Sequence, residues 1–134
     1  EKAFKLHHKE KYKEAIEILK ELNKERITKT DLNFHTIIGH CFYKLKRHKE
    51  ALKYFKRATK IDSKSELASL SLYLALVKAD KSDKAIEEIK RYLNKYPAKL
   101  FRVTLKELLG DFKDGYATNF KEIILPLAKK GNIK

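Results

Sequence analysis

Residues 32–63 place small and aromatic side chains at helical intervals in two successive segments. Those sharing a face are Ile38, Gly39 and Phe42 in the first segment and Ala51, Phe55 and Ala58 in the second. Gly39 and Ala51 carry almost no side chain, so two helix backbones can approach closely where they lie. Phe42 and Phe55 can then fill the space around that contact. The stretch therefore predicts two antiparallel amphipathic helices joined by a short basic turn.

This pattern resembles the tetratricopeptide repeat, a 34-residue helix–turn–helix unit. Counting from Leu32 as position 1, the signature residues at positions 8, 11, 20, 24 and 27 are Gly39, Phe42, Ala51, Phe55 and Ala58. His35 and Ser63 stand where the family usually has Trp and Pro. Ala85 follows Ala51 by one full period, so the unit repeats towards the C-terminus. Tyr73 and Tyr92 occupy positions that favour small residues, which predicts a wider helix separation in that unit.

The resemblance implies an all-α fold, a right-handed α-solenoid of stacked helix–turn–helix hairpins that ends in a C-terminal capping helix pair. We expect one domain over residues 1–134, with a partial first repeat (1–31), a second repeat (32–65), a third repeat (66–99) and capping helices (100–134). The first repeat is expected to have a degenerate leading helix followed by a turn and a helix over Tyr12–Asn23. The inward residues predicted for that helix are Ala15, Ile18, Leu19 and Leu22.

The charge balance is strongly basic, with 32 Lys and Arg against 18 Asp and Glu and a net charge of +14. This favours an acidic partner, which could be a protein or peptide, a nucleic acid or an anionic membrane surface. A lysine-rich solvated surface is the alternative explanation. No apolar run is long enough for a membrane span, and no secretory h-region is present, so a cytoplasmic location is favoured. The chain starts without Met, which suggests a fragment of a longer protein.

Motifs of catalysis and metal binding are missing from the sequence. It contains no Gly-rich phosphate loop, no cysteine pair and no helical His-Glu-x-x-His. The adjacent histidines His7 and His8 diverge on a helix and would chelate poorly. The single cysteine, Cys41, lies in an apolar helical stretch and is expected to be buried. We therefore expect no enzyme activity, no catalytic residues, no metal and no cofactor.

The resemblance implies that helix positions 2, 5, 9, 12 and 13 face a concave groove. In the second repeat these are Asn33, Thr36, His40, Tyr43 and Lys44, and in the third they are Leu67, Leu70, Leu74, Val77 and Lys78. The first set is polar and aromatic, which is typical of a peptide-contacting face, whereas the second is strongly apolar. The predicted partner contacts are the whole first set, with Leu67, Leu70 and Leu74 as apolar anchors. An exposed stripe of this kind is unusual unless something covers it.

Three candidates for that cover remain open. The C-terminal helix around Phe120–Leu127 could curl into the groove, a partner's helix or extended segment could bind there, or a second copy of the chain could form a homodimer.

A second candidate surface is a basic ridge made by the turns within the hairpins, since stacking brings turns one period apart side by side. Its residues are Lys9, Lys11 and Lys13 in the first unit, Lys44, Lys46, Arg47 and Lys49 in the second, and Lys78, Lys81 and Lys84 in the third. Few aromatic residues lie nearby to stack on bases. A solvated lysine-rich face is the favoured explanation of the ridge.

From these features we predict a non-catalytic protein–protein interaction module, a scaffold or adaptor that holds a peptide or helix of a partner in its groove. The alternatives are nucleic-acid or acidic-polymer binding through the basic ridge, and a homo-oligomerisation domain that uses the apolar stripe.

Overall fold

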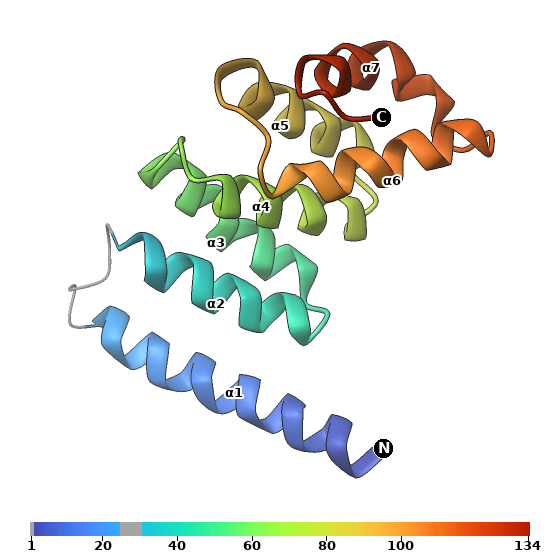
Figure 1. Cartoon of the computed structure of the whole chain (residues 1–134). Coiled ribbons are helices and arrows are strands. Elements are labelled where there is room, and N and C mark those ends of the chain that lie inside the picture. The colour runs from blue at the N-terminus through green and yellow to red at the C-terminus, as the bar shows by residue number, and fades with distance from the viewer. Residues whose placement is uncertain (1, 25–30) are drawn as a thin grey trace.

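The fold is all-α. The computed structural model describes the backbone of residues 2–24 and 31–134, and the side chains of residues 8–22 and 31–134. These residues form seven α-helices and a short 3₁₀ helix, with no strand among them (Figure 1). The elements are α1 (Lys2–Lys24), α2 (Leu32–Lys44), α3 (His48–Ile61), α4 (Glu66–Lys78), α5 (Ser82–Lys95), α6 (Phe101–Lys113), η1 (Thr118–Phe120) and α7 (Lys121–Lys130).

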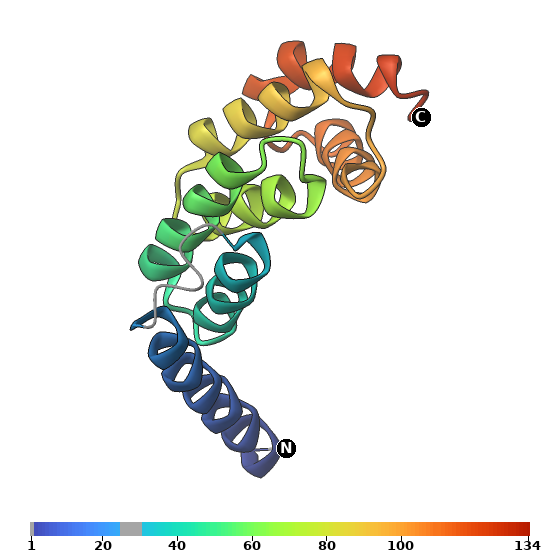
Figure 2. The same ribbon diagram turned by 90° about the vertical axis from the view of Figure 1, so that its left-hand side faces the viewer.

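Two successive hairpins share one length and spacing. Helices α4 and α5 begin and end 34 residues after α2 and α3, respectively. Each hairpin packs its own two helices together, and α3 and α2 both pack on α4. Figure 2 shows the hairpins along an arc, with α2, α4 and α6 on its inner side and α3 and α5 on its outer side. The stack thus presents one row of helices to a concave face.

Small residues sit where α2 and α3 touch. Ala51 and Ala58 are fully buried, and Gly39 lies against the ring of Phe55. A Cβ atom built on Gly39 would lie 2.6 Å from Cε1 of Phe55, closer than real contacts allow. The prediction that small side chains mark the close approach of the two backbones is therefore confirmed here.

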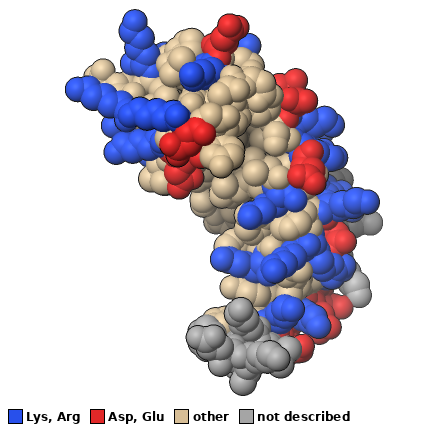
Figure 3. Space-filling view, turned by 90° about the vertical axis from the view of Figure 1, so that its right-hand side faces the viewer, with Lys and Arg blue, Asp and Glu red and all other residues tan. Residues whose placement is uncertain are grey.

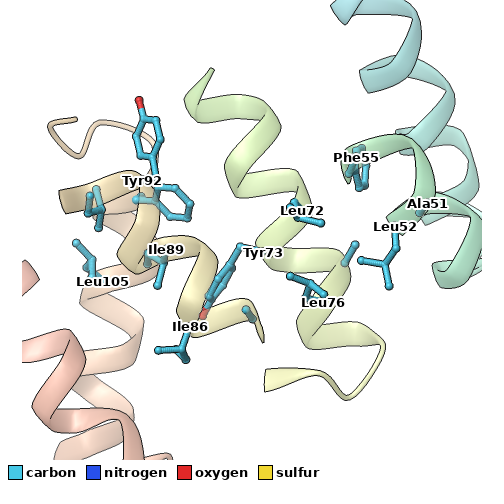
Figure 4. Packing of buried hydrophobic residues seen from close by; sticks show 14 of the residues in the cluster. Ala51, Leu52, Phe55, Leu72, Tyr73, Leu76, Ile86, Ile89, Tyr92 and Leu105 are labelled. Carbon is cyan, nitrogen blue, oxygen red and sulfur yellow. The ribbon is translucent and has the colours of Figure 1, made fainter. Parts of the chain in front are cut away.

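The third unit accommodates tyrosines where the second has glycine and alanine. Tyr73 is buried between α4 and α5 with its ring directed towards Ile86 (Figure 4). Its ring also meets Phe101 of α6 edge-on, with 6.0 Å between the ring centroids. Tyr92 is likewise buried and contacts the same Phe101 ring at 5.7 Å. The bulk of the two tyrosines therefore forms the contact with the following helix.

The hairpin turns are closed by a repeated helix-terminating motif. After α2, the backbone N–H groups of Lys46 and Arg47 donate to the carbonyls of Tyr43 and Phe42, which is the Schellman pattern. The same pair of bonds recurs 34 residues later, where Asp80 replaces Lys46. Both residues adopt a left-handed conformation, with φ of 60° and 59°. Each helix of the inner row is thus turned sharply back towards its partner.

Side-chain caps begin the inner helices. Asp31 accepts bonds from the backbone of Asn33 and Phe34 at the start of α2, and Ser65 accepts one from Ala68 at the start of α4. Glu66 follows Ser63 by three residues, which is the spacing of a capping box. Its carboxylate instead accepts backbone N–H bonds from Lys99 (2.8 Å) and Phe101 (2.9 Å), so α4 supplies the cap of α6.

The first unit differs from the prediction. Residues 2–24 form one continuous helix, α1, where a degenerate helix, a turn and a second helix were expected. No Gly, Pro or helix-capping residue occurs between Lys2 and Leu22, so nothing in the sequence ends the helix early. Ile16 is buried against α2, whereas Ile18 and Leu22, both predicted to face inward, are 63% and 42% exposed.

The C-terminal pair is also less regular. Helix α6 starts 35 residues after α4, and α7 starts only at Lys121, after η1. Ala117 has a left-handed φ of 52°, which is not a helical conformation, so the last helix does not extend back to this residue. Helix α7 packs against α5 and α6.

Candidate functional site: a concave groove and a basic outer face

The inner face of α4 carries an apolar row that the chain leaves in solvent. Leu67, Leu74 and Val77 are 54%, 40% and 38% exposed, and Leu70 between them is half-buried. The residues of α4 that pack into the core are Ala68, Leu72, Tyr73, Ala75 and Leu76. This helix is therefore apolar on both sides, although only one side is covered.

The C-terminal helix, one of the three candidates for covering the groove, does not fill it. Helix α7 packs against α5 and α6, and it leaves Leu67 and Leu74 exposed. Within the segment Phe120–Leu127, Phe120 alone lines the same cavity as Leu74 and Val77. The connection between α6 and α7, which includes η1, is longer than those within the two preceding hairpins, and α7 lies outside the groove.

The predicted polar contacts lie on α2, next to this row. Asn33, His40 and Lys44 are exposed, while Thr36 and Tyr43 are half-buried. The Thr36 hydroxyl donates to the Leu32 carbonyl at 2.9 Å, so its hydrogen is already used within the helix.

Two of these α2 side chains lie against other rings. The Tyr43 ring meets His48 edge-on at 5.6 Å, and the His40 ring meets Tyr12 of α1 at 6.4 Å. Partial burial lowers the pKa of His40, and the neighbouring Lys44 lowers it further. His40 therefore presents a neutral imidazole near pH 7, able to donate and accept a hydrogen bond.

A cleft that sequence reasoning missed opens at the end of the apolar row, between α4, α5, α6 and η1. Its volume is about 300 Å³. We call it the acidic cleft; its walls include Tyr73, Leu74 and Val77 of α4, Ala85 and Ile86 of α5, Thr104, Glu107, Leu108 and Asp111 of α6, and Phe120 of η1. The available signal was the pair Glu107 and Asp111, four residues apart and so on one face of a helix.

The basic ridge is only partly assembled as predicted. Lys46, Arg47 and Lys49 lie at the α2–α3 turn, and Lys81 and Lys84 lie 35 residues further on, at the α4–α5 turn. Figure 3 looks onto this end of the stack, where Lys and Arg side chains outnumber acidic ones. Arg47 is the least available of these, because it pairs with Glu50 and stacks 5.0 Å over the Phe42 ring.

The contribution expected from the first unit is corrected by the fold. Lys9, Lys11 and Lys13 are exposed, but they lie along α1 and at no turn. Lys13 also pairs with Glu10 at 3.6 Å. The predicted ridge therefore takes turns from two units only.

A further basic surface runs along the outer face of α3. Its residues, Lys49, Lys53, Lys56, Arg57 and Lys60, line a shallow depression of about 460 Å³ together with Lys81 from the next turn. Within the described part of the chain none of these lysines forms an ion pair. The signal in the sequence was their spacing of four, three and four residues, which puts four lysines on one helical face. We call this surface the α3 basic face.

Neither metal ligation nor a membrane span stands out in residues 8–22 and 31–134. No group of three or more His, Cys, Asp or Glu side chains there could hold an ion. No helix in that part combines the length and the apolar character needed to cross a bilayer. Cys41 is buried, and burial raises the pKa of its thiol, so the group stays protonated near neutral pH.

Comparison with known proteins agrees with the geometry. Residues 33–65 match the family model described as tetratricopeptide repeat, a range that covers α2 except for Leu32, all of α3, and Ser65, the N-cap of α4. Searches of curated proteins and of solved structures gave no match. Repeats of this family generally mediate protein–protein interaction and are typically not enzymes. Residues 33–65 thus form one tetratricopeptide repeat, and the all-α stack built around it has the architecture of a helical-repeat solenoid of that type.

Proposed function

We propose that this chain is a non-catalytic scaffold or adaptor that binds an apolar helix or extended segment of another protein in its concave groove. The observation that carries the proposal is the solvent-exposed row of Leu67, Leu74 and Val77 on a helix whose opposite side is core. Exposed apolar rows next to polar residues are typical of protein-binding grooves.

The groove offers both affinity and orientation. Covering a fully exposed leucine side chain is worth about 1.5–3 kcal/mol, so three anchors that are each about half exposed contribute about 2–4 kcal/mol towards a micromolar affinity of about 8 kcal/mol. The exposed polar residues of α2, Asn33, His40 and Lys44, lie beside this row and can hydrogen-bond the partner's backbone or side chains. Affinity would then come from α4 and orientation from α2.

The test is capture of the partner by the tagged chain and by a charge-insertion variant, Leu74→Asp. Leu74 is 40% exposed, so the variant should fold, which a circular dichroism melt checks. We expect capture to fall at least about tenfold, because a buried carboxylate opposes apolar contact. The control is Leu125→Asp, at a similarly exposed leucine on α7. Equal capture by all three proteins would refute the groove as the binding site.

Self-association is the competing use of the same row. Sedimentation of the free chain over a range of concentrations separates the two. A homodimer that dissociates on Leu74→Asp would assign the row to a second copy of the chain.

A second function, binding of an anionic polymer, is favoured by one specific observation. The α3 basic face concentrates lysines without acidic partners beside a depression on the outer side of the arc. Successive lysines such as Lys49 and Lys53 are about 6 Å apart along the helix axis, close to the spacing of alternate side chains on an extended strand. The match suits an acidic polypeptide, with a nucleic acid as the competing ligand.

A further inference from the structure

We propose that the acidic cleft is a binding pocket for one cationic side chain, an arginine or lysine, of the segment held in the groove. This inference rests on the proposed groove function and adds a requirement for the partner, namely a basic residue next to its apolar anchors. The positive charge required of this partner residue is opposite in sign to the charge of the acidic partner that the net charge of the chain suggests.

The geometry of the cleft suits a long side chain with a charged end. Thr104, Glu107, Leu108 and Asp111 are spaced so that they lie on one face of α6. Leu74 and Val77 face them from α4, and Phe120 lies on the wall formed by η1. At about 300 Å³ the cleft has roughly ten times the volume of one water molecule. The apolar walls can contact the methylene stem of an arginine, and the carboxylates can meet its head group.

Three polar groups around the cleft have no hydrogen-bond or ion-pair partner within the described residues. Neither Glu107 nor Asp111 forms an ion pair there. Tyr73 is only 6% exposed, lines the cleft and makes no side-chain hydrogen bond in the same part of the chain. The almost fully buried Tyr73 side chain thus has no hydrogen-bond partner among the described residues, on the wall of a cleft that also carries two exposed, unpaired carboxylates, an arrangement that suits a cationic ligand.

The protonation state of Tyr73 agrees with this role. Burial raises the pKa of Tyr73 to about 12, and the nearby carboxylates of Glu107 and Asp111 raise it as well. The hydroxyl is thus neutral near pH 7 and can donate to a carboxylate while accepting a bond from a guanidinium or ammonium N–H.

The two carboxylates do not serve the stability of α6. Like charges four residues apart on a helix repel each other. Asp111 also lies in the last turn of α6, where the helix dipole already presents negative charge. A bound cation would relieve both effects, and planar guanidinium suits carboxylate oxygens better than ammonium does.

The direct test is an NMR titration of the whole chain with two short probes. The first is acetyl-leucyl-arginyl-leucinamide, and the second is its citrulline counterpart, which has the same shape without the charge. We expect the arginine probe to shift the amide signals of Leu74, Glu107 and Phe120 and to bind at least about tenfold more tightly than the citrulline probe. Equal binding of the two probes would overturn the proposal.

Variants locate the effect. Glu107→Gln combined with Asp111→Asn should abolish the preference for arginine while melting no lower than the unmodified chain. Tyr73→Phe keeps the ring and should weaken arginine binding a few-fold. The matched control is Glu87→Gln with Glu122→Gln, two exposed carboxylates that do not line the cleft, which should keep the full preference. A preference that survives removal of both cleft carboxylates would also overturn the proposal.

The outcomes also separate this inference from the groove proposal. If the probes bind equally while Leu74→Asp still abolishes partner capture, the groove function stands and the cation pocket is refuted. If Leu74→Asp captures the partner as well as the unmodified chain does while the cleft still prefers the arginine probe, the groove function is refuted. The role of the cleft in partner recognition is then refuted as well.

Discussion

The contact between α2 and α3 depends on the absence of one methyl group. Gly39 lies so close to Phe55 that no β-carbon fits without moving the ring. Phe55 is itself almost fully buried and cannot swing into solvent. Gly110 provides the contrast, because no atom lies within 4 Å of where its β-carbon would be. The chain therefore offers one glycine required by packing and one that only weakens its helix.

We predict opposite effects of alanine at these two glycines. Gly39→Ala should lower the free energy of unfolding by about 1–3 kcal/mol, because it overpacks the helix contact. Gly110→Ala should raise it by about 0.5–1 kcal/mol, because alanine is the better helix former in the interior of α6. Urea unfolding followed by circular dichroism measures both, and the same sign for the two variants would contradict the packing described.

His40 gives a prediction on pH. Burial and Lys44 depress its pKa in the folded chain below the ordinary value of 6.5. The unfolded chain therefore binds more protons as the pH falls below about 6.5, and this group's contribution to stability is lost there. His40→Gln should be less sensitive to acid than the unmodified chain between about pH 7.5 and 5.5, as measured by urea midpoints. A steeper decline in the variant would show that the pKa is shifted the other way.

Single residues also show where sequence reasoning succeeds and fails. Gly39 and Ala51 were predictable, since their role follows from local spacing within one hairpin. The partners of Glu66 and the contact of Tyr73 with Phe101 were not, because they join residues 28 to 35 positions apart through the stacking of units. The sequence shows that Glu107 and Asp111 lie on one helical face, but only the structure shows that this face lines a cleft.

At the scale of helices, the repeat predicted α2 to α5 well and α1 poorly. The register carried back from Ala51 implied a turn near Lys9 and Lys11, but the local sequence holds no residue that ends a helix there. Local helix propensity therefore prevails over the family pattern. In α1 two apolar stripes overlap, and the structure buries the one containing Ile16 and leaves Ile18 outside.

The start of α6 yields a prediction about helices. Leu100, the N-cap residue of α6, has no side-chain hydrogen-bond acceptor. The carboxylate of Glu66 in α4 accepts the bond from the Phe101 N–H in its place. Glu66→Ala should destabilise the chain by about 0.5–2 kcal/mol, the range for removal of a cap, and speed hydrogen exchange of the Phe101 amide. The stability of Glu66→Gln should lie between that of the unmodified chain and that of Glu66→Ala. The control is Glu87→Ala, on the exposed face of α5, and an equal destabilisation in that variant would refute a specific cap.

At the scale of the whole molecule, charge is divided between two surfaces. The outer side carries the α3 basic face, and the C-terminal end of the inner side carries the acidic cleft. A net charge of +14 therefore describes the average surface and not the groove. A partner that used both surfaces would need a basic residue inside the arc and acidic groups outside it.

Salt dependence tests the outer surface. We expect labelled oligoglutamate and single-stranded oligo-dT to bind more weakly as salt rises, with oligoglutamate bound more tightly. Lys53→Glu with Lys56→Glu should reduce the slope of log affinity against log salt for oligo-dT by about 1.4, because each phosphate neutralised by a lysine contributes about 0.7. Lys95→Glu with Lys121→Glu changes the net charge equally and serves as control. Identical slopes for the two variants would mean that net charge alone drives the binding.

The bonds from Glu66 also couple the two walls of the acidic cleft. The same carboxylate that begins α4 accepts both backbone hydrogens at the start of α6. A segment that pushed these helices apart would have to break both hydrogen bonds to Oε2 of Glu66, so the opening is rigid at one end. The partner segment, and not the cleft, would then have to change its conformation on binding. A segment that is unstructured when free would lose conformational entropy as it enters a pocket whose shape is already fixed.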